Sequence, residues 1–181
     1  MSGKHQEAPG GLETVRAFVN SVDLEGATEE LTDPDALVAW LADHHLIEPG
    51  SPADAADLRK ALEVREALRA LMRANNGGEP SPEATDALRA AARRARIALE
   101  FGPDGSQLEP QAGGVDGALG RLLARVHEAQ HEGTWERMKA CPWHTCHWAF
   151  YDHTKNRSGV WCNMAVCGNR AKARAYRERH G

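Results

Sequence analysis

Long apolar runs are missing from this 181-residue chain, and aromatic residues make up only 6% of it. Without a run of about 18 or more apolar residues, no membrane-spanning helix is predicted. The first residues lack the basic segment followed by an apolar segment that is typical of a secretory signal, so we expect a cytoplasmic protein. The sequence also lacks a phosphate-binding glycine loop, a Ser/His/Asp arrangement and an open three-ligand metal motif. These absences indicate no particular enzyme class, and we lean towards a protein that is not an enzyme.

Cysteine is scarcer still, with four residues, and its placement is the strongest pattern in the chain. The spacing is C-x4-C-x15-C-x4-C within 27 residues, and the four positions are Cys141, Cys146, Cys162 and Cys167. Two close pairs separated by the length of a hairpin can bring four thiolates to one tetrahedral site. Structural zinc fits best because it accepts four sulfur ligands without redox chemistry. Two disulfides or an iron–sulfur cluster are the alternatives, and disulfides would suit a secreted protein.

The residues around these cysteines resemble the CGNR zinc finger over about residues 139–179. The resemblance rests on Phe150-Tyr-Asp, Lys155-Asn-Arg-Ser, Trp161-Cys-Asn-Met and Cys167-Gly-Asn-Arg. In that family the finger ends a chain that begins with an ABATE domain, described as a stress-induced bacterial transcription regulator. A looser match to ABATE lies in Phe18-Val-Asn and Leu31-Thr-Asp-Pro. We therefore divide the chain into a disordered leader (1–10), a helical ABATE-like domain (11–136) and a CGNR-type zinc finger (137–181).

Formal charge is divided unevenly between these parts. From Arg137 to the end there are nine Lys or Arg residues against two acids, a net charge of +7, which leaves −11 on the first 136 residues. A basic finger on an acidic body favours the finger as the part that meets DNA. A basic solvated helix face is the alternative. The candidate phosphate contacts are Lys155, Arg157, Lys172, Arg174 and Arg177.

One departure from the family pattern counts against DNA binding. Members commonly carry two arginines between the hairpin Ser and the Trp-Cys pair, whereas this chain has Gly159-Val160 there. Three histidines also cluster near the first cysteine pair, namely His144, His147 and His153. Since four cysteines complete a tetrahedral site, we expect these histidines to lie beside the ligands or in solvent.

The predicted fold is mainly α, with a helical body that contains one short β-hairpin, followed by a small α+β module similar to a treble clef. Apolar periodicity and capping residues predict helices over about 12–22, 34–47, 51–75, 81–96 and 115–130. The hairpin is predicted over 97–101 and 107–110. In the finger, Trp148 and Phe150 are expected on a strand, with Trp161 opposite on a returning strand. Asn163 is expected to cap a helix that runs to about Arg179.

Several side chains have two interpretations. Phe18, Asn20 and Arg65 are candidates for lining a ligand pocket in the body. For Asn20 we favour a helix-end residue that bonds to local backbone. For Arg65, with Arg69 and Arg73 at i+4 steps, a solvated face offset by Glu63 and Glu66 is the commoner arrangement. Asn169 and Arg170 are expected to brace the finger through the loop carbonyls around 155–158.

Three functions stay open at this point. The leading hypothesis is a bacterial transcription regulator whose body senses a small molecule or partner and whose zinc finger binds DNA. The second is an enzyme of a specialised metabolic pathway, with its active site in the helical body and a purely structural zinc. The third is an adaptor whose finger binds another protein. A homodimer is the ordinary expectation for a regulator, and no membrane partner is expected.

Overall fold

The computed structural model describes residues 7–103 and 105–180. Within that part of the chain the helices are α1 (Leu12–Val19), α2 (Pro34–Asp43), α3 (Ala55–Ala74), α4 (Pro82–Ala95), α5 (Gly114–His131) and α6 (Asn169–His180). Two short helical turns, Trp135–Arg137 and Met164–Gly168, lie before and within the finger. These helices confirm the predicted mainly α fold. None of the described helices is both long enough and apolar enough to cross a bilayer.

Three antiparallel strand pairs complete the fold. They are β1 (Val22–Asp23) with β2 (Thr28–Glu29), β3 (Ile97–Gly102) with β4 (Gly105–Pro110), and β5 (Met138–Ala140) with β6 (Ala149–Tyr151). The β3–β4 hairpin is the one predicted for the body. The β1–β2 pair, with two residues in each strand, was not predicted from the sequence. The predicted strand at Trp161 is wrong. The partner of β6 is β5, which precedes it in the chain, and Trp161 lies in a loop.

Capping residues explain where the helices begin. Asp33 accepts a hydrogen bond from the amide of Ala36 ahead of Pro34, and Ser81 caps α4 in the same way ahead of Pro82, as predicted. The start predicted at Ser51 is wrong. Helix α3 begins at Ala55 because Asp54 and Asp57 form a reciprocal capping box, which satisfies two amide donors at once.

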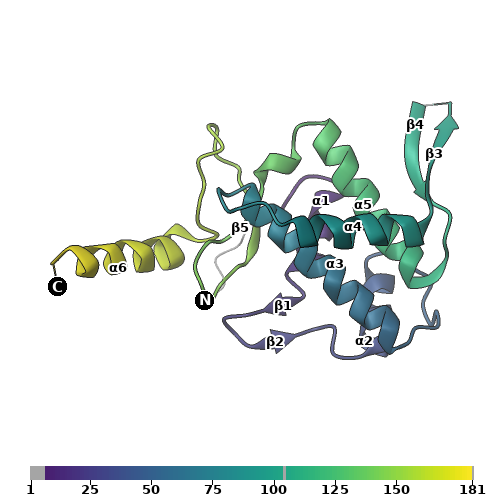
Figure 1. The fold of residues 1–181 in the computed structure, drawn as a ribbon, viewed down its shortest axis with the longest axis horizontal. Helices are drawn as coiled ribbons and strands as arrows, with labels where there is room; N and C mark the ends of the chain where they lie inside the picture. Colours follow the sequence, from purple (N-terminus) through teal and green to yellow (C-terminus); the bar gives the residue numbers. More distant parts are fainter. Residues whose placement is uncertain (1–6, 104, 181) are drawn as a thin grey trace.

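The hydrophobic core lies between α1, α2, α3 and α5 (Figure 1). Phe18, Leu68 and Leu119 are fully buried in it. The same core takes in Met138 from β5 and Ala149 from β6, both also fully buried. The β5–β6 hairpin, the first part of the predicted finger, therefore packs within the body core and not beside it.

Side-chain amides and a guanidinium from the body bond to the backbone of this hairpin region. Asn20 bonds both polar groups of Ala149, donating to its carbonyl at 2.9 Å and accepting from its amide at 2.8 Å. Arg69 on α3 donates to the carbonyls of Val19 and His147. Because buried backbone groups need partners, these contacts fix the hairpin to α1 and α3.

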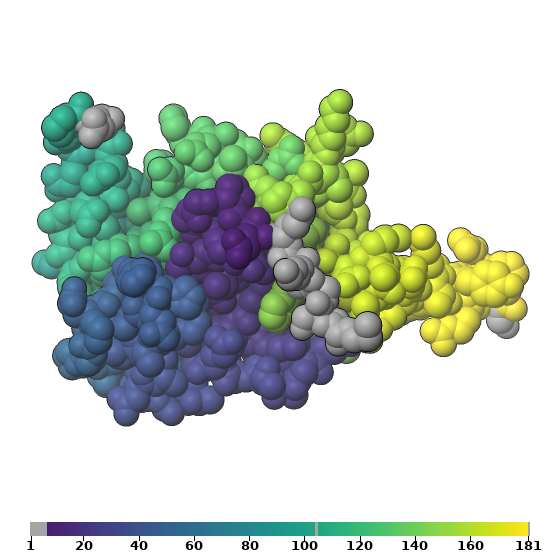
Figure 2. Space-filling model, turned by 180° about the vertical axis from the view of Figure 1, so that it is seen from behind, coloured from purple at the N-terminus to yellow at the C-terminus, as the bar shows by residue number. Residues whose placement is uncertain are grey.

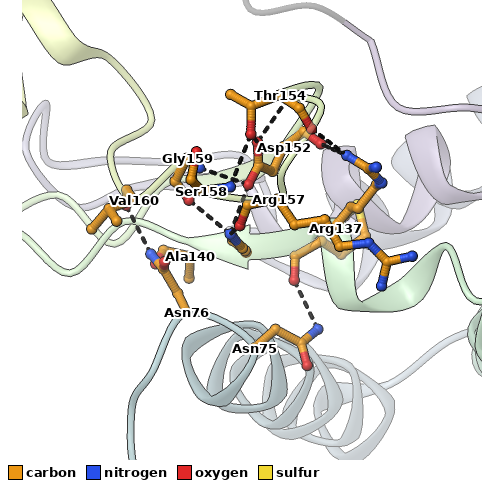
Figure 3. Close-up of polar contacts among 12 residues, drawn as sticks. Asn75, Asn76, Arg137, Ala140, Asp152, Thr154, Arg157, Ser158, Gly159 and Val160 are labelled. Atoms are coloured by element: carbon orange, nitrogen blue, oxygen red, sulfur yellow. Dashed lines mark hydrogen bonds and ion pairs between the residues drawn. The ribbon is translucent and has the colours of Figure 1, made fainter.

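Two asparagines directly after the C-terminal end of α3 also bond to the hairpin region. Asn75 donates to the carbonyls of Trp135 and Met138, and Asn76 donates to those of Ala140 and Val160, all at 2.8–2.9 Å (Figure 3). Two neighbouring asparagines thus bind the entry of the finger and the loop that leads to its third cysteine.

The structure can be compared with the predicted leader and with the predicted domain boundary. Residues 1–6 of the predicted disordered leader lie outside the described residues, whereas Ala8 is buried and donates its amide to Glu13. The predicted boundary at 136/137 falls inside the short helical turn Trp135–Arg137, and Trp135 of this turn shares one core with Met138 of β5.

We predict that Asn20→Ala lowers the free energy of unfolding by about 2–4 kcal/mol, because it leaves the buried amide and carbonyl of Ala149 without partners. Urea unfolding of the zinc-loaded protein measures this. Asn156→Ala, an exposed asparagine of the finger loop, is the matched control and should change stability by less than about 0.5 kcal/mol. Equal effects of the two substitutions would contradict the prediction.

Candidate metal centre and basic helix

The four cysteine sulfurs come together at one point. They lie within 4.8 Å of one another, with 3.5 Å between the sulfurs of Cys146 and Cys162 and 3.8 Å between those of Cys162 and Cys167. Four sulfurs bound to zinc at about 2.3 Å lie about 3.8 Å apart, so the cluster has the dimensions of a tetrahedral zinc site. All four cysteines are free thiols, without a disulfide between them.

Local elements aim each sulfur at this point. Cys141 directly follows β5, and its amide donates to the carbonyl of Trp148, which closes the loop between β5 and β6. Cys167 lies in the turn Met164–Gly168, whose start is capped by the Asn163 side chain, as predicted. Cys141, Cys146 and Cys167 are buried and Cys162 is half-buried, with Trp143, Trp148 and Trp161 packed around them.

Electrostatics of the thiol cluster favour a bound cation. Hydrogen bonds from Cys146 and Cys162 lower the pKa of Cys141 to about 2. Hydrogen bonding to Cys141 raises the pKa of Cys162, and burial together with the charge of Cys141 raises the pKa of Cys167 to about 12. The cluster by itself thus stabilises one thiolate, and a divalent cation is what allows all four to be deprotonated. Four sulfurs leave no open position, which is the form of a structural site.

A buried ion pair holds the loop that follows β6. The ammonium of Lys139 lies 2.7 Å from Asp152 and also donates to the carbonyls of Arg157 and Gly159, so all three of its protons are used. Asp152 accepts further bonds from Thr154 and Gly159. Burial alone would raise the pKa of Asp152, but these hydrogen bonds outweigh it and lower the pKa to about 2.

Arg137 supplements this anchor by donating to the carbonyls of Asp152 and Thr154 (Figure 3). Two of the nine finger cations, Arg137 and Lys139, are therefore internal supports and are not free to bind DNA. Both contribute to the net charge of +7 counted for the finger, although neither is among the phosphate contacts predicted from the sequence. A lysine placed between Met138 and Ala140 in an apolar segment was the signal that it faces a buried partner.

The residues expected to brace the finger have other contacts. Asn169 donates to the carbonyl of Ala165 within its own turn. Arg170 forms an ion pair with Glu25 from the turn between β1 and β2. The loop carbonyls near 155–158 are instead bound by Arg137 and Lys139. Arg170 therefore connects α6 to the body through this ion pair.

The remaining finger cations are exposed. Arg157 lies 3.7 Å from Glu136, and Arg174 pairs with Glu178 one turn further along α6. Four cations form no ion pair with any described residue, and they are Lys155, Lys172, Arg177 and Arg179. Arg179 is an addition to the set predicted from the sequence. Helix α6 has no buried residue and projects from the body, as Figure 2 shows at its yellow end.

The predicted pocket residues are engaged within the fold. Phe18 is fully buried in the core and packs on Trp40. Asn20 does end α1, but its side chain bonds to Ala149 far along the chain and not to local backbone. Arg65 is 5% exposed and binds Glu29 with two bonds of 2.7 and 2.8 Å, so the solvated-face interpretation is wrong for it. The 640 Å³ groove beside Leu46 and Arg121 contains none of these three residues.

The three finger histidines are not ligands of the four-sulfur cluster. His144 is exposed and packs against Trp143, and the ring of His153 bonds to the carbonyl of Glu7. His147 is half-buried, with a backbone φ of 50°.

Comparison with known families accounts for both parts of the chain. Residues 13–136 match the ABATE family, whose description is "putative stress-induced transcription regulator", and residues 137–180 match the CGNR zinc finger. This protein belongs to the ABATE family. The CGNR finger completes the family architecture that the sequence resembled, and with the four clustered sulfurs it supports a structural zinc ion as the cofactor. A comparison with curated proteins gives no match.

We predict that Cys162→Ala in this ABATE protein lowers zinc content from about one ion per chain to near zero, since one lost thiolate opens a structural site. Helix α6 should lose its order with the metal, while β5 and β6 stay in the body core. Metal analysis and hydrogen exchange measure the two effects. His144→Ala is the control and should keep its zinc; its loss there would show that a histidine is a ligand.

We predict that Asp152→Asn costs about 3–5 kcal/mol of stability, because it leaves the Lys139 charge buried without a counter-ion. Chemical unfolding measures the cost. The depressed pKa of Asp152 contributes stability that is complete above about pH 4 and is lost as pH falls towards 2, so the cost should be constant between about pH 6 and 8. Glu178→Gln removes an exposed ion pair and should cost at most about 0.5 kcal/mol.

Proposed function

We propose that this protein is a DNA-binding transcription regulator whose zinc finger contacts the phosphate backbone through α6. The observation that carries the proposal is the state of this helix. Helix α6 has five Arg or Lys residues against one Glu, and no residue of it is buried. A helix that buries none of its residues against the described part of the chain gains little from folding alone, so a partner surface is its physical rationale.

The chemistry of the exposed groups fits a polyanion. Lys172, Arg177 and Arg179 form no ion pair with the described residues, so a phosphate need not displace a carboxylate from them. Arg177 donates only to the carbonyl of Ala173, one turn earlier in α6. Phosphate contacts supply affinity and position a protein on the duplex without reading its sequence. A helix of this width also fits the major groove.

The rest of the finger supports the same role by fixing the base of this helix. The zinc site anchors the turn before α6, and the Arg170–Glu25 pair ties the first residues of α6 to the β1–β2 turn. The loop after β6, which carries Lys155, projects from the same end of the molecule in another direction (Figure 1). We therefore assign the main contact to α6 and a smaller one to Lys155.

The family description supports the regulatory part of the proposal. Effector sensing by the body is part of the same hypothesis, and the groove beside Leu46 and Arg121 has the size of a small-molecule site. Arg65 and Arg69, which an enzyme could have used for an acidic substrate, are bound to Glu29, Glu66 and backbone carbonyls. Among residues 7–103 and 105–136, no arrangement favours the enzyme alternative over the regulator.

The test is DNA binding by the zinc-loaded protein over a series of salt concentrations, with its own upstream DNA and an unrelated duplex. Replacing Lys172, Arg177 and Arg179 together by Gln should weaken binding to both duplexes and lower the log–log salt slope by about 2–3. Binding to the upstream DNA should exceed binding to the unrelated duplex for the unaltered protein.

A body variant of equal charge provides the control. Arg59, Arg89 and Arg93 are exposed on α3 and α4, and their replacement by Gln changes the net charge by the same amount. This control should retain affinity and slope within experimental error. Equal losses in both triple variants would assign binding to net charge, and an absence of binding at low salt would overturn the proposal.

A further inference from the structure

The β3–β4 hairpin carries the most exposed large apolar side chains of the body. Phe101 is 82% exposed and Leu99 is 55% exposed. They lie on one face with Ile97, since residues two apart on a strand share a face, and their cross-strand partners are Ser106, Leu108 and Pro110. The hairpin lies at the end of the molecule opposite α6, and its tip extends beyond the helices (Figure 1). Leu99 and Phe101 therefore lack the cover that the apolar face of a two-stranded sheet needs.

The residues of β3 that carry this apolar face also have backbone groups without a hydrogen-bond partner among the described residues. The amide of Gln111 donates to the carbonyl of Arg96, so 96/111 is a hydrogen-bonded pair just below the ladder. Hydrogen-bonded and non-bonded pairs alternate along an antiparallel ladder. Ile97, Leu99 and Phe101 are therefore the residues whose amides and carbonyls point away from β4, towards the outer edge.

The two edges of the hairpin differ. Strand β4 packs against α5, and Pro110 supplies no amide to its outer edge. Strand β3 has its main contact with β4 and no comparable contact with another described element. Unpaired amides and carbonyls along an exposed edge are a template for another strand.

We propose that β3 pairs with β3 of a second copy of this chain, antiparallel and with the two-fold axis at Leu99. In this register Leu99 lies opposite Leu99, and Ile97 lies opposite Phe101 of the other copy. These outward-pointing residues would exchange about six backbone hydrogen bonds. The result is a four-stranded sheet with a continuous apolar face.

The sequence of β3 argues for a second copy as the occupant. A two-fold interface must be complementary to itself, and β3 meets this condition about Leu99 both in backbone polarity and in side chains. Glu100 comes opposite Ala98 of the other copy. A register centred on Glu100 would set two carboxylates directly opposite, which is unfavourable, and one centred on Ala98 would leave Phe101 beyond the paired strands.

The apolar face of the hairpin is not closed by α5. A groove of about 450 Å³ separates the hairpin from α5, lined in part by Leu99, Leu108 and His127. In the proposed register Phe101 of the second copy lies beside Ile97 on the apolar face. The two α6 helices then lie far from the two-fold axis, because each α6 is at the opposite end of its chain from the hairpin (Figure 1).

Sedimentation equilibrium of the zinc-loaded protein without DNA tests the proposal independently of the proposed function. The mass should rise towards twice the chain mass with concentration. Leu99→Lys should raise the dimer dissociation constant at least tenfold, because it sets two ammonium groups opposite each other at the axis. Gln107→Lys, the same added charge on the polar face of β4, should leave it unchanged.

A second variant tests the register. Ala98→Lys places a cation opposite Glu100 of the other copy twice in each dimer, so it should tighten the dimer several-fold, and adding Glu100→Lys should remove the gain. A monomer at every concentration, a dimer that Leu99→Lys leaves intact, or equal weakening by Gln107→Lys would each overturn the proposal. So would weakening by Ala98→Lys, or capture of a different protein by β3 in a chain that stays monomeric.

Discussion

The insertion of the β5–β6 hairpin into the body core is the constraint on which the rest of the structure depends. Each strand has only three residues, which is too short for independent stability, so its buried backbone groups take partners from α1 and α3. Asn20 and Arg69 provide those partners across the predicted domain boundary. Cys141, the first zinc ligand, follows β5 at once and is therefore fixed relative to the body.

This arrangement separates the finger into an inner and an outer part. The inner part holds the Lys139–Asp152 pair and the hairpin, and its cations serve the fold. The outer part is α6, which depends on the zinc site and on Arg170 for its attachment. A basic helix attached by its first turn to one end of an acidic body suits electrostatic binding to a polyanion, since the body repels the ligand from other faces. At the opposite end the free edge of β3 offers a surface for a second copy.

Local signals explain what the sequence could predict. Cap residues such as Asp33 and Ser81, apolar periodicity and the cysteine spacing act over a few residues, and they correctly predicted most helices, the β3–β4 hairpin and the metal site. Contacts between distant segments explain the errors. The strand partner of β6, the burial of Arg65 and the bond from Asn20 to Ala149 depend on segments that meet only in the folded chain. The capping box at Asp54 was a local signal that the Ser-Pro pair obscured.

Native-state hydrogen exchange of the zinc-loaded protein most directly tests whether the finger hairpin and the body form one cooperative unit. We expect the amides of β5 and β6 to exchange with the same free energy of opening as those of α3, whereas α6 should exchange much faster. Exchange of β5 and β6 at a clearly lower free energy than α3, together with α6, would contradict it. The finger would then be a separate module attached to the body.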